Sequence, residues 1–254
     1  MVIQCSMDES HYRDHQRVFA VSAIFAKWDR WQMLIGDWQR IFKSEGIKYF
    51  KSSDCGAVNG EFRKFRRDER RITDAERRKC NAIRHSLLMC FLDAKITVTG
   101  FCVNMDAWEE VVNTPERLAL FKGSPFYYCY LWAMMQCAEI VKGTQFSLAF
   151  AYDQEQEHGP LLQEAFNELK RVRVDYAPYM RTIAPFNDHD FVPIQAADLI
   201  ASIIRQYAAW KILKPRPGIP HEWKLLREAR VVASVRVSGT KQLANDLREG
   251  EREN

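Results

Sequence analysis

One short segment constrains the fold more than any other. Residues 146–152 read FSLAFAY, an almost unbroken apolar run that ends at Asp153. A run of this kind, without polar alternation, is typical of a strand inside a sheet that is covered on both faces. The chain must then provide two layers of helices around that sheet. Its 254 residues, 47% of them hydrophobic, are enough for such a core.

The rest of the chain carries patterns for these layers. We expect strands at 2–7 and 18–26, forming a hairpin about a polar turn at 11–16, and further strands at 47–50, 96–103 and 180–184. Helices are expected at 28–43, 74–93, 125–141, 160–171 and from Pro193 onward, with a basic loop at 52–71. Residues 1–213 thus predict an α/β fold, a mixed sheet with helices on both faces.

Residues 214–254 are expected to form a C-terminal extension. Three prolines in 214–220 cannot continue the preceding helix and indicate a linker. A short helix at 222–229, a strand at 231–237 and a frayed charged end at 249–254 should follow it.

Several classes of protein are disfavoured by the sequence. No segment is long and apolar enough to span a membrane, and the first residues do not have the pattern of a signal peptide. The seven cysteines include no CxxC pair, so free thiols in a reducing cytoplasm are expected. The chain contains no GxGxxG, P-loop or GxSxG motif, and no nucleotide cofactor is predicted.

Three aspartates occupy unusual positions. Asp8 ends the first strand, and Asp153 ends the most apolar one, where α/β sheets place ligand chemistry. On a helical wheel of the segment after Pro193, the polar residues fall within an arc of roughly 100° on an otherwise apolar helix. That arc contains Gln195, Asp198, Ser202, Arg205 and Gln206.

Each aspartate also has a simpler interpretation, as a turn former, a helix cap or a solvated side chain. Should all three converge, that interpretation fails, because clustered carboxylates repel one another and their burial is costly. An oxygen-only ligand set suits Mg²⁺ or Mn²⁺. We therefore treat Asp8, Asp153 and Asp198 as candidate metal ligands.

The charge of the chain is concentrated in one segment. Residues 61–85 contain ten Lys or Arg against five acids. Such an excess can follow a phosphate backbone, which makes Arg66, Arg67, Arg70 and Arg71 candidate contacts to a nucleic acid. The alternative is a solvated helix entry with i,i+4 ion pairs.

Other candidates are weaker. Lys51 can meet a phosphate, although a solvated lysine is the simpler interpretation. Asp188 and Asp190 are expected to charge a helix entry, and His158 and His189 are ambiguous. The aromatic residues of 126–132 can stack bases, but their helical spacing favours a place in the core.

Three motifs in this order resemble a known family. They are MDES at 7–10, AYDQ at 151–154 and PIQAADLIA at 193–201. The chain is similar over residues 1–212 to the bacterial and phage family called domain of unknown function 3800, which is assigned a ribonuclease-H-like fold. Members usually carry Gly after the first motif, whereas this chain has His11.

The resemblance implies a nuclease with a two-metal site. Asp8 would bridge the cations, Asp153 and Asp198 would flank them, and Glu9 would be a fourth catalytic carboxylate, although strand alternation points it to the other face. Gln195 falls on the last motif as a candidate substrate contact. The alternatives are a non-catalytic nucleic-acid-binding or regulatory protein with the same fold, and a phosphohydrolase of smaller substrates.

Overall fold

The apolar run becomes β4 (Ser147–Asp153), an inner strand of a six-stranded sheet. The computed structural model describes residues 1–10, 17–68, 71–154, 159–213 and 217–253. Within them the strand order is β5-β4-β1-β2-β3-β6. The other strands are β1 (Val2–Ser10), β2 (Val18–Ala26), β3 (Thr97–Asn104), β5 (Met180–Phe186) and β6 (Val232–Ser238).

The sheet is mixed. β2 is antiparallel to both β1 and β3, whereas β4 runs parallel to β1 and to β5. This arrangement confirms the predicted α/β class and is consistent with the ribonuclease-H-like fold. The predicted turn of the first hairpin lies outside the described residues, but the pairing of β1 with β2 is as expected.

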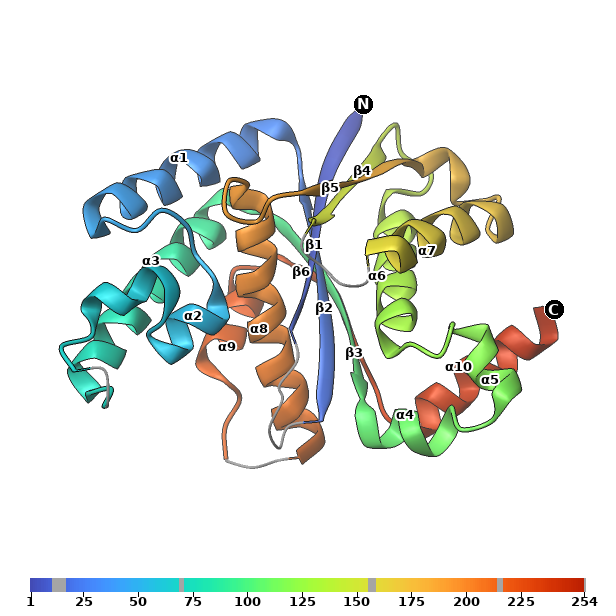
Figure 1. Ribbon diagram of the computed structural model, residues 1–254. Helices are drawn as coiled ribbons and strands as arrows, with labels where there is room; N and C mark the ends of the chain where they lie inside the picture. The colour runs from blue at the N-terminus through green and yellow to red at the C-terminus, as the bar shows by residue number, and fades with distance from the viewer. Residues whose placement is uncertain (11–16, 69–70, 155–158, 214–216, 254) are drawn as a thin grey trace.

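Helices cover both faces of the sheet (Figure 1). One layer contains α1 (Trp28–Glu45), α2 (Ser52–Ala57), α3 (Asp74–Ala94), α8 (Val192–Leu213) and α9 (His221–Glu228). The other contains α4 (Met105–Val111), α5 (Pro115–Leu120), α6 (Pro125–Val141), α7 (Gly159–Val172) and α10 (Thr240–Glu253). Each layer buries its own apolar cluster against the sheet.

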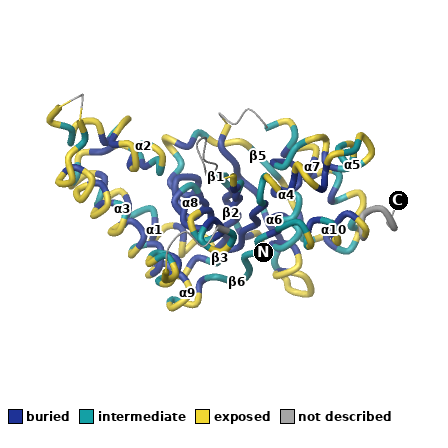
Figure 2. Tube along the Cα trace, turned by 90° about the horizontal axis from the view of Figure 1, so that it is seen from below, coloured by how far each residue is buried: buried dark blue, intermediate teal, exposed yellow. Residues whose placement is uncertain are grey.

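Burial follows these layers. In Figure 2 the central strands and α8 are mostly dark blue, while the outer helices expose part of their surface. The aromatic residues of α6 are mainly buried, including Phe126, Tyr128 and Tyr130, which confirms their place in the core. All seven cysteines are free thiols. Over the described part of the chain, no helix is long and apolar enough to cross a membrane.

Three local predictions were wrong, and two helices were not predicted. Residues 47–50 are not a strand, because the backbone N–H groups of Lys48 and Phe50 donate to the side chains of Glu61 and Gln195 and not to the sheet. The predicted basic loop contains α2 and the 3₁₀ helix η1 (Gly60–Phe65), which bury Cys55 and Phe62. The two helices that were not predicted are α4 and α5, which are too short to show a clear periodicity. The charged end, expected to fray, continues as α10.

The C-terminal extension joins the main sheet. β6 pairs in parallel with β3, and α10 packs against α4. The linker is described only from residue 217. The predicted helix and strand of the extension are present as α9 and β6.

Candidate active site

The register of the sheet brings Asp8 and Asp153 together. Ser6 pairs with Ala151 across the parallel strands β1 and β4, so each aspartate lies two residues further along neighbouring strands. Adjacent strands are about 4.8 Å apart, and residues two apart share a face. Asp8 and Asp153 therefore lie side by side on one face of the sheet, and Asp153 is 7% exposed.

Helix α8 covers the same face and carries Asp198. The Ser22 hydroxyl donates to the Ala197 carbonyl at 2.8 Å, and Ser22 is the β2 residue paired with Asp8. Gly100 in β3 permits this close packing, because a Cβ there would meet Ile204 Cδ1 at 2.6 Å. A hydrogen bond from Ser22 thus fixes the residue before Asp198 directly opposite Asp8.

The electrostatics of these carboxylates agree with this geometry. Burial raises the pKa of Asp8 well above its usual value, and the charges of Glu9, Asp198 and Asp153 raise it further. Burial also raises the pKa of Asp198 to about 6, despite a hydrogen bond from the Ser52 backbone N–H and the nearby charges of Arg84 and Lys51. Burial and mutual repulsion therefore both favour the protonated forms of these carboxyl groups.

The donor set has the chemistry of a site for a hard divalent cation. It offers carboxylate oxygens only, in a partly buried position and with mutual repulsion. Within the described residues, however, no group of three or more Asp, Glu, His or Cys side chains is arranged so that it could hold a metal ion. The carboxylates are within electrostatic reach of one another without forming a closed coordination shell.

Comparison with known proteins adds no family. No family model matches the chain. A search of curated proteins also found no match. The resemblance to the domain of unknown function 3800 family therefore stays a prediction, based on the three motifs.

Glu9 points away from the aspartates. Its carboxylate accepts a hydrogen bond at 2.7 Å from the Tyr130 hydroxyl of α6, in the opposite helical layer. Burial raises the pKa of Glu9 to about 6, and the hydrogen bond from Tyr130 opposes that shift. Strand alternation predicted this orientation. Glu9 anchors the end of β1 to α6, on the face of the sheet opposite Asp8.

Lys51 lies beside the aspartates. Its ammonium is 2.9 Å from Asp188, and its side chain is 37% exposed, so it is not the fully solvated lysine of the simpler interpretation. Burial alone would lower the pKa of Lys51, but the hydrogen bond and charge of Asp188, with the charges of Asp153 and Asp8, raise it. Lys51 is therefore a cation held at the edge of the acidic cluster.

Gln195 holds the two segments that meet at this ion pair. Its side-chain oxygen accepts from the Phe50 N–H at 3.0 Å, and its side-chain nitrogen donates to the carbonyls of Asp188 and His189 at 2.7 and 3.2 Å. The side chain is 2% exposed. In this structure Gln195 thus positions Lys51 and Asp188 through their backbones. Its predicted contact with a substrate stays untested.

Two functional residues were not found from the sequence. Asp188, expected only to charge a helix entry, is buried as the partner of Lys51. Arg84, counted with the basic stretch, donates to Glu222 of α9 and to Ser202 of α8, and its charge lowers the pKa of Asp198. A helical wheel of α3 could have identified Arg84, because it lies one turn after the buried Cys80 and therefore on the same side of the helix.

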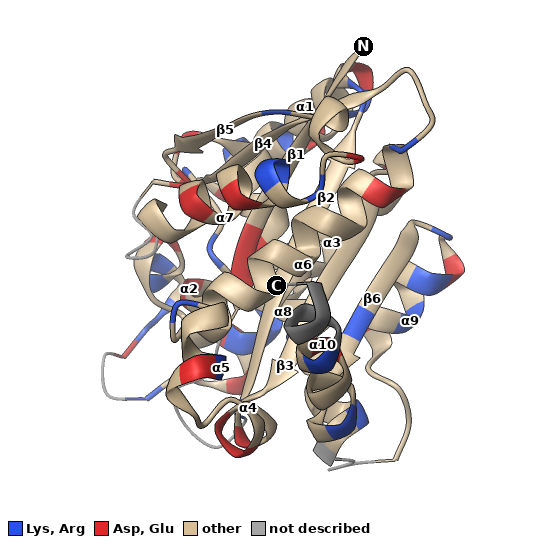
Figure 3. Cartoon of the chain, turned by 90° about the vertical axis from the view of Figure 1, so that its right-hand side faces the viewer, with Lys and Arg blue, Asp and Glu red and all other residues tan. Residues whose placement is uncertain are grey.

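Three of the candidate basic residues, Arg66, Arg67 and Arg71, lie between η1 and α3 and are called the basic surface below. Arg67 and Arg71 are exposed, and Arg66 donates to Asn59 at 3.1 Å. Arg70 and His158 lie outside the described residues. In contrast, the side facing the viewer in Figure 3 mixes both signs of charge over α5 and α10. The basic surface is connected to the acidic cluster through α2, whose first residue, Ser52, binds Asp198.

Proposed function

We propose that this protein is a metal-dependent phosphodiesterase that cleaves RNA or DNA. The observation that carries the proposal is the position of Asp8 beside Asp153 on one face of the sheet, under the helix that carries Asp198. The charges of Asp198 and Asp153 raise the pKa of Asp8. Carboxylates that repel one another in a partly buried position do not stabilise a fold. A divalent cation, Mg²⁺ or Mn²⁺, is the partner that would offset their charges.

Each residue of the cluster has a part in this proposal. Asp8 of β1, Asp153 of β4 and Asp198 of α8 would hold the cations. When bound, the cations would lower the pKa of an attacking water and offset charge on the leaving oxygen. Lys51 would offer its ammonium to a phosphate oxygen at the edge of the cluster, in exchange for Asp188. Gln195 would keep the backbones of both residues in place.

The basic surface favours a polymer over a small phosphate ester. A small substrate needs only the charges beside the scissile bond, whereas a nucleic acid continues across the surface. The exposed arginines of the α2–α3 region lie outside the acidic cluster and suit the continuing backbone.

The wild-type protein provides the first test. We expect Mn²⁺ to raise the melting temperature, because a cation that binds only the folded state stabilises it. We also expect cleavage of at least one of four labelled substrates, namely single-stranded and duplex RNA and DNA, with loss of cleavage in a chelator. Cleavage that persists unchanged in the chelator would contradict the role of a metal.

One observation favours a second candidate, a nucleic-acid-binding protein without catalysis. The described side chains do not yet form a group that could hold a metal. A protein that binds nucleic acid, cleaves none of the four substrates and is not stabilised by Mn²⁺ would be of this second kind.

A separate prediction concerns the basic surface. Replacing Arg67 and Arg71 with alanine should weaken nucleic-acid binding and make its salt dependence shallower, by a slope of about 0.9 for each lost phosphate contact to duplex DNA. Both side chains are exposed, so the melting temperature should not change. The measurement is binding at several salt concentrations. The double variant Arg227→Ala/Arg230→Ala, on the α9 side, is the control. An unchanged slope would indicate a merely solvated surface.

A further inference from the structure

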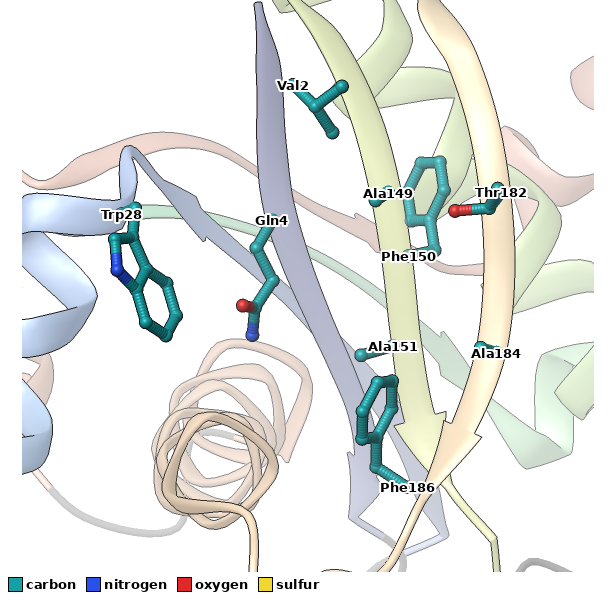
Figure 4. A pocket seen from close by; sticks show the side chains of 9 residues that line it. All are labelled: Val2, Gln4, Trp28, Ala149, Phe150, Ala151, Thr182, Ala184 and Phe186. Carbon is teal, nitrogen blue, oxygen red and sulfur yellow. The ribbon is translucent and has the colours of Figure 1, made fainter.

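A groove lies on the sheet face that carries Asp8 and Asp153 (Figure 4). Its volume is about 260 Å³, close to the smaller ligand pockets of proteins, which start at about 300 Å³. Ala149 and Ala151 of β4 and Ala184 of β5 form its floor, while Trp28, at the start of α1, and Phe186, at the end of β5, stand at its sides.

The groove exists because this face is only partly covered. Helix α8 packs on β1, β2 and β3 but contacts β4 only slightly, so in the described part of the chain the outer part of this sheet face is only slightly covered. Small side chains on the floor deepen the hollow. Trp28 is 56% exposed and Phe186 is 39% exposed. Two partly exposed aromatic rings therefore stand beside an apolar floor.

The groove leads to the candidate active site. Ala149, Ala151 and Asp153 alternate on one face of β4, as do Gln4 and Asp8 on β1. Phe186 is the β5 partner of Asp153 in the sheet register. Asp153 lies two residues beyond Ala151, which is about 7 Å at the usual strand rise. One end of the groove is therefore next to the carboxylates.

A positive charge lies at the other end. Arg181 donates to the Ser147 hydroxyl at 3.3 Å, at the first residue of β4. A polymer that carries aromatic rings and negative charges would complement the aromatic rings and this positively charged group.

We infer that the groove binds the bases of a single-stranded nucleic acid leading to or from the scissile phosphate. The position of that phosphate rests on the proposed function. Exposed aromatic rings stack on unpaired bases of any sequence, and nearby cations bind the backbone. In a duplex the base faces are already stacked. A peptide that extended the sheet would bind at the β5 edge and not on this face.

The test measures binding without cleavage. The probe is a fluorescein-labelled deoxythymidine oligomer of about 12 nucleotides, within the usual site sizes of about 4–16 nucleotides. Its anisotropy is followed in a chelator, alone and as a duplex with its complement. Trp28→Ala and Phe186→Ala should each weaken single-strand binding by about fivefold to a hundredfold. Duplex binding should change by less than twofold.

Two further variants make the test independent of the aromatic residues. Ala149→Leu fills the floor of the groove and should weaken single-strand binding to a similar extent. Met33→Ala lies on α1, as Trp28 does, and removes a 38% exposed side chain away from the groove, so binding should not change. Melting temperatures establish that each variant is folded.

Three results would overturn the inference. They are unchanged single-strand binding in both Trp28→Ala and Ala149→Leu, an equal loss of duplex binding, and a wild-type dimer in light scattering that Trp28→Ala dissociates, since the groove would then bind a second copy. A wild type that cleaves nucleic acid with no role for Trp28 contradicts the groove alone. A wild type that needs Trp28 for binding but never cleaves contradicts the proposed function alone.

Discussion

Replacing Asp198 with asparagine should reduce metal-dependent cleavage by about a thousandfold or more. The substitution keeps the size of the side chain and its hydrogen bond from Ser52, but it removes a charge that a cation needs. Metal ions provide several kcal/mol of transition-state stabilisation, and each 1.36 kcal/mol is a factor of ten in rate.

The same substitution should stabilise the metal-free protein. Because the pKa of Asp198 is raised to about 6, its ionisation at neutral pH costs the fold about 3 kcal/mol at most. Asparagine does not have this cost, so we expect a gain of about 1–3 kcal/mol and the loss of most stabilisation by Mn²⁺.

The measurement is paired, combining the melting temperature with and without Mn²⁺ and the rate of cleavage. Asp190→Asn is the matched control, since Asp190 is exposed just before α8 and should affect neither quantity. If Asp198→Asn unfolds more easily yet cleaves normally, Asp198 is a structural residue and the metal site is wrong.

Stability without metal should fall as the pH rises from about 4 to about 7. A carboxyl whose pKa is higher in the folded than in the unfolded state stabilises the fold while it is protonated, and this contribution disappears as pH passes the folded pKa. Burial raises the pKa of Asp198 and of Glu9 to about 6 and raises that of Asp8 well above its usual value. Asp198 alone corresponds to about 3 kcal/mol, or roughly 6–12 °C in melting temperature.

Mn²⁺ should reduce this fall, because it stabilises the ionised carboxylates. The measurement is denaturant unfolding across that pH range, in a chelator and in Mn²⁺. Asp198→Asn in the chelator should show a shallower dependence than the wild type. A wild-type protein whose stability rises with pH over the same range would contradict the raised pKa values.

The positions of the aspartates could be predicted because they follow from periodicity. Alternation along β1 places Asp8 on one face and Glu9 on the other, and the helical wheel of α8 singles out Asp198. In the structure, Glu9 and Asp198 lie on the sides of β1 and α8 that the strand alternation and the helical wheel predicted. Local periodicity is a property of consecutive residues, so a single sequence is sufficient to reveal it.

Contacts between distant segments could not be predicted in this way. Lys51 and Asp188 belong to irregular segments that only the fold brings together, and the bonds of Gln195 to both segments depend on where α8 lies. The groove was also missed, because it results from a helix that does not cover β4 and β5. The pattern of a single sequence does not show how far a helical layer extends over the sheet.

The pairing of β6 with β3 has a consequence for how the chain reaches its final form. β3 lies between β2 and β6, and both of its edges are hydrogen-bonded. During synthesis, β2 and β3 leave the ribosome long before residues 232–238, so one edge of β3 has no partner meanwhile. An open strand edge is a template for pairing with another chain. β6 therefore takes the place of β3 as the edge strand at this end of the sheet, and β3 can pair with another chain only until β6 has formed.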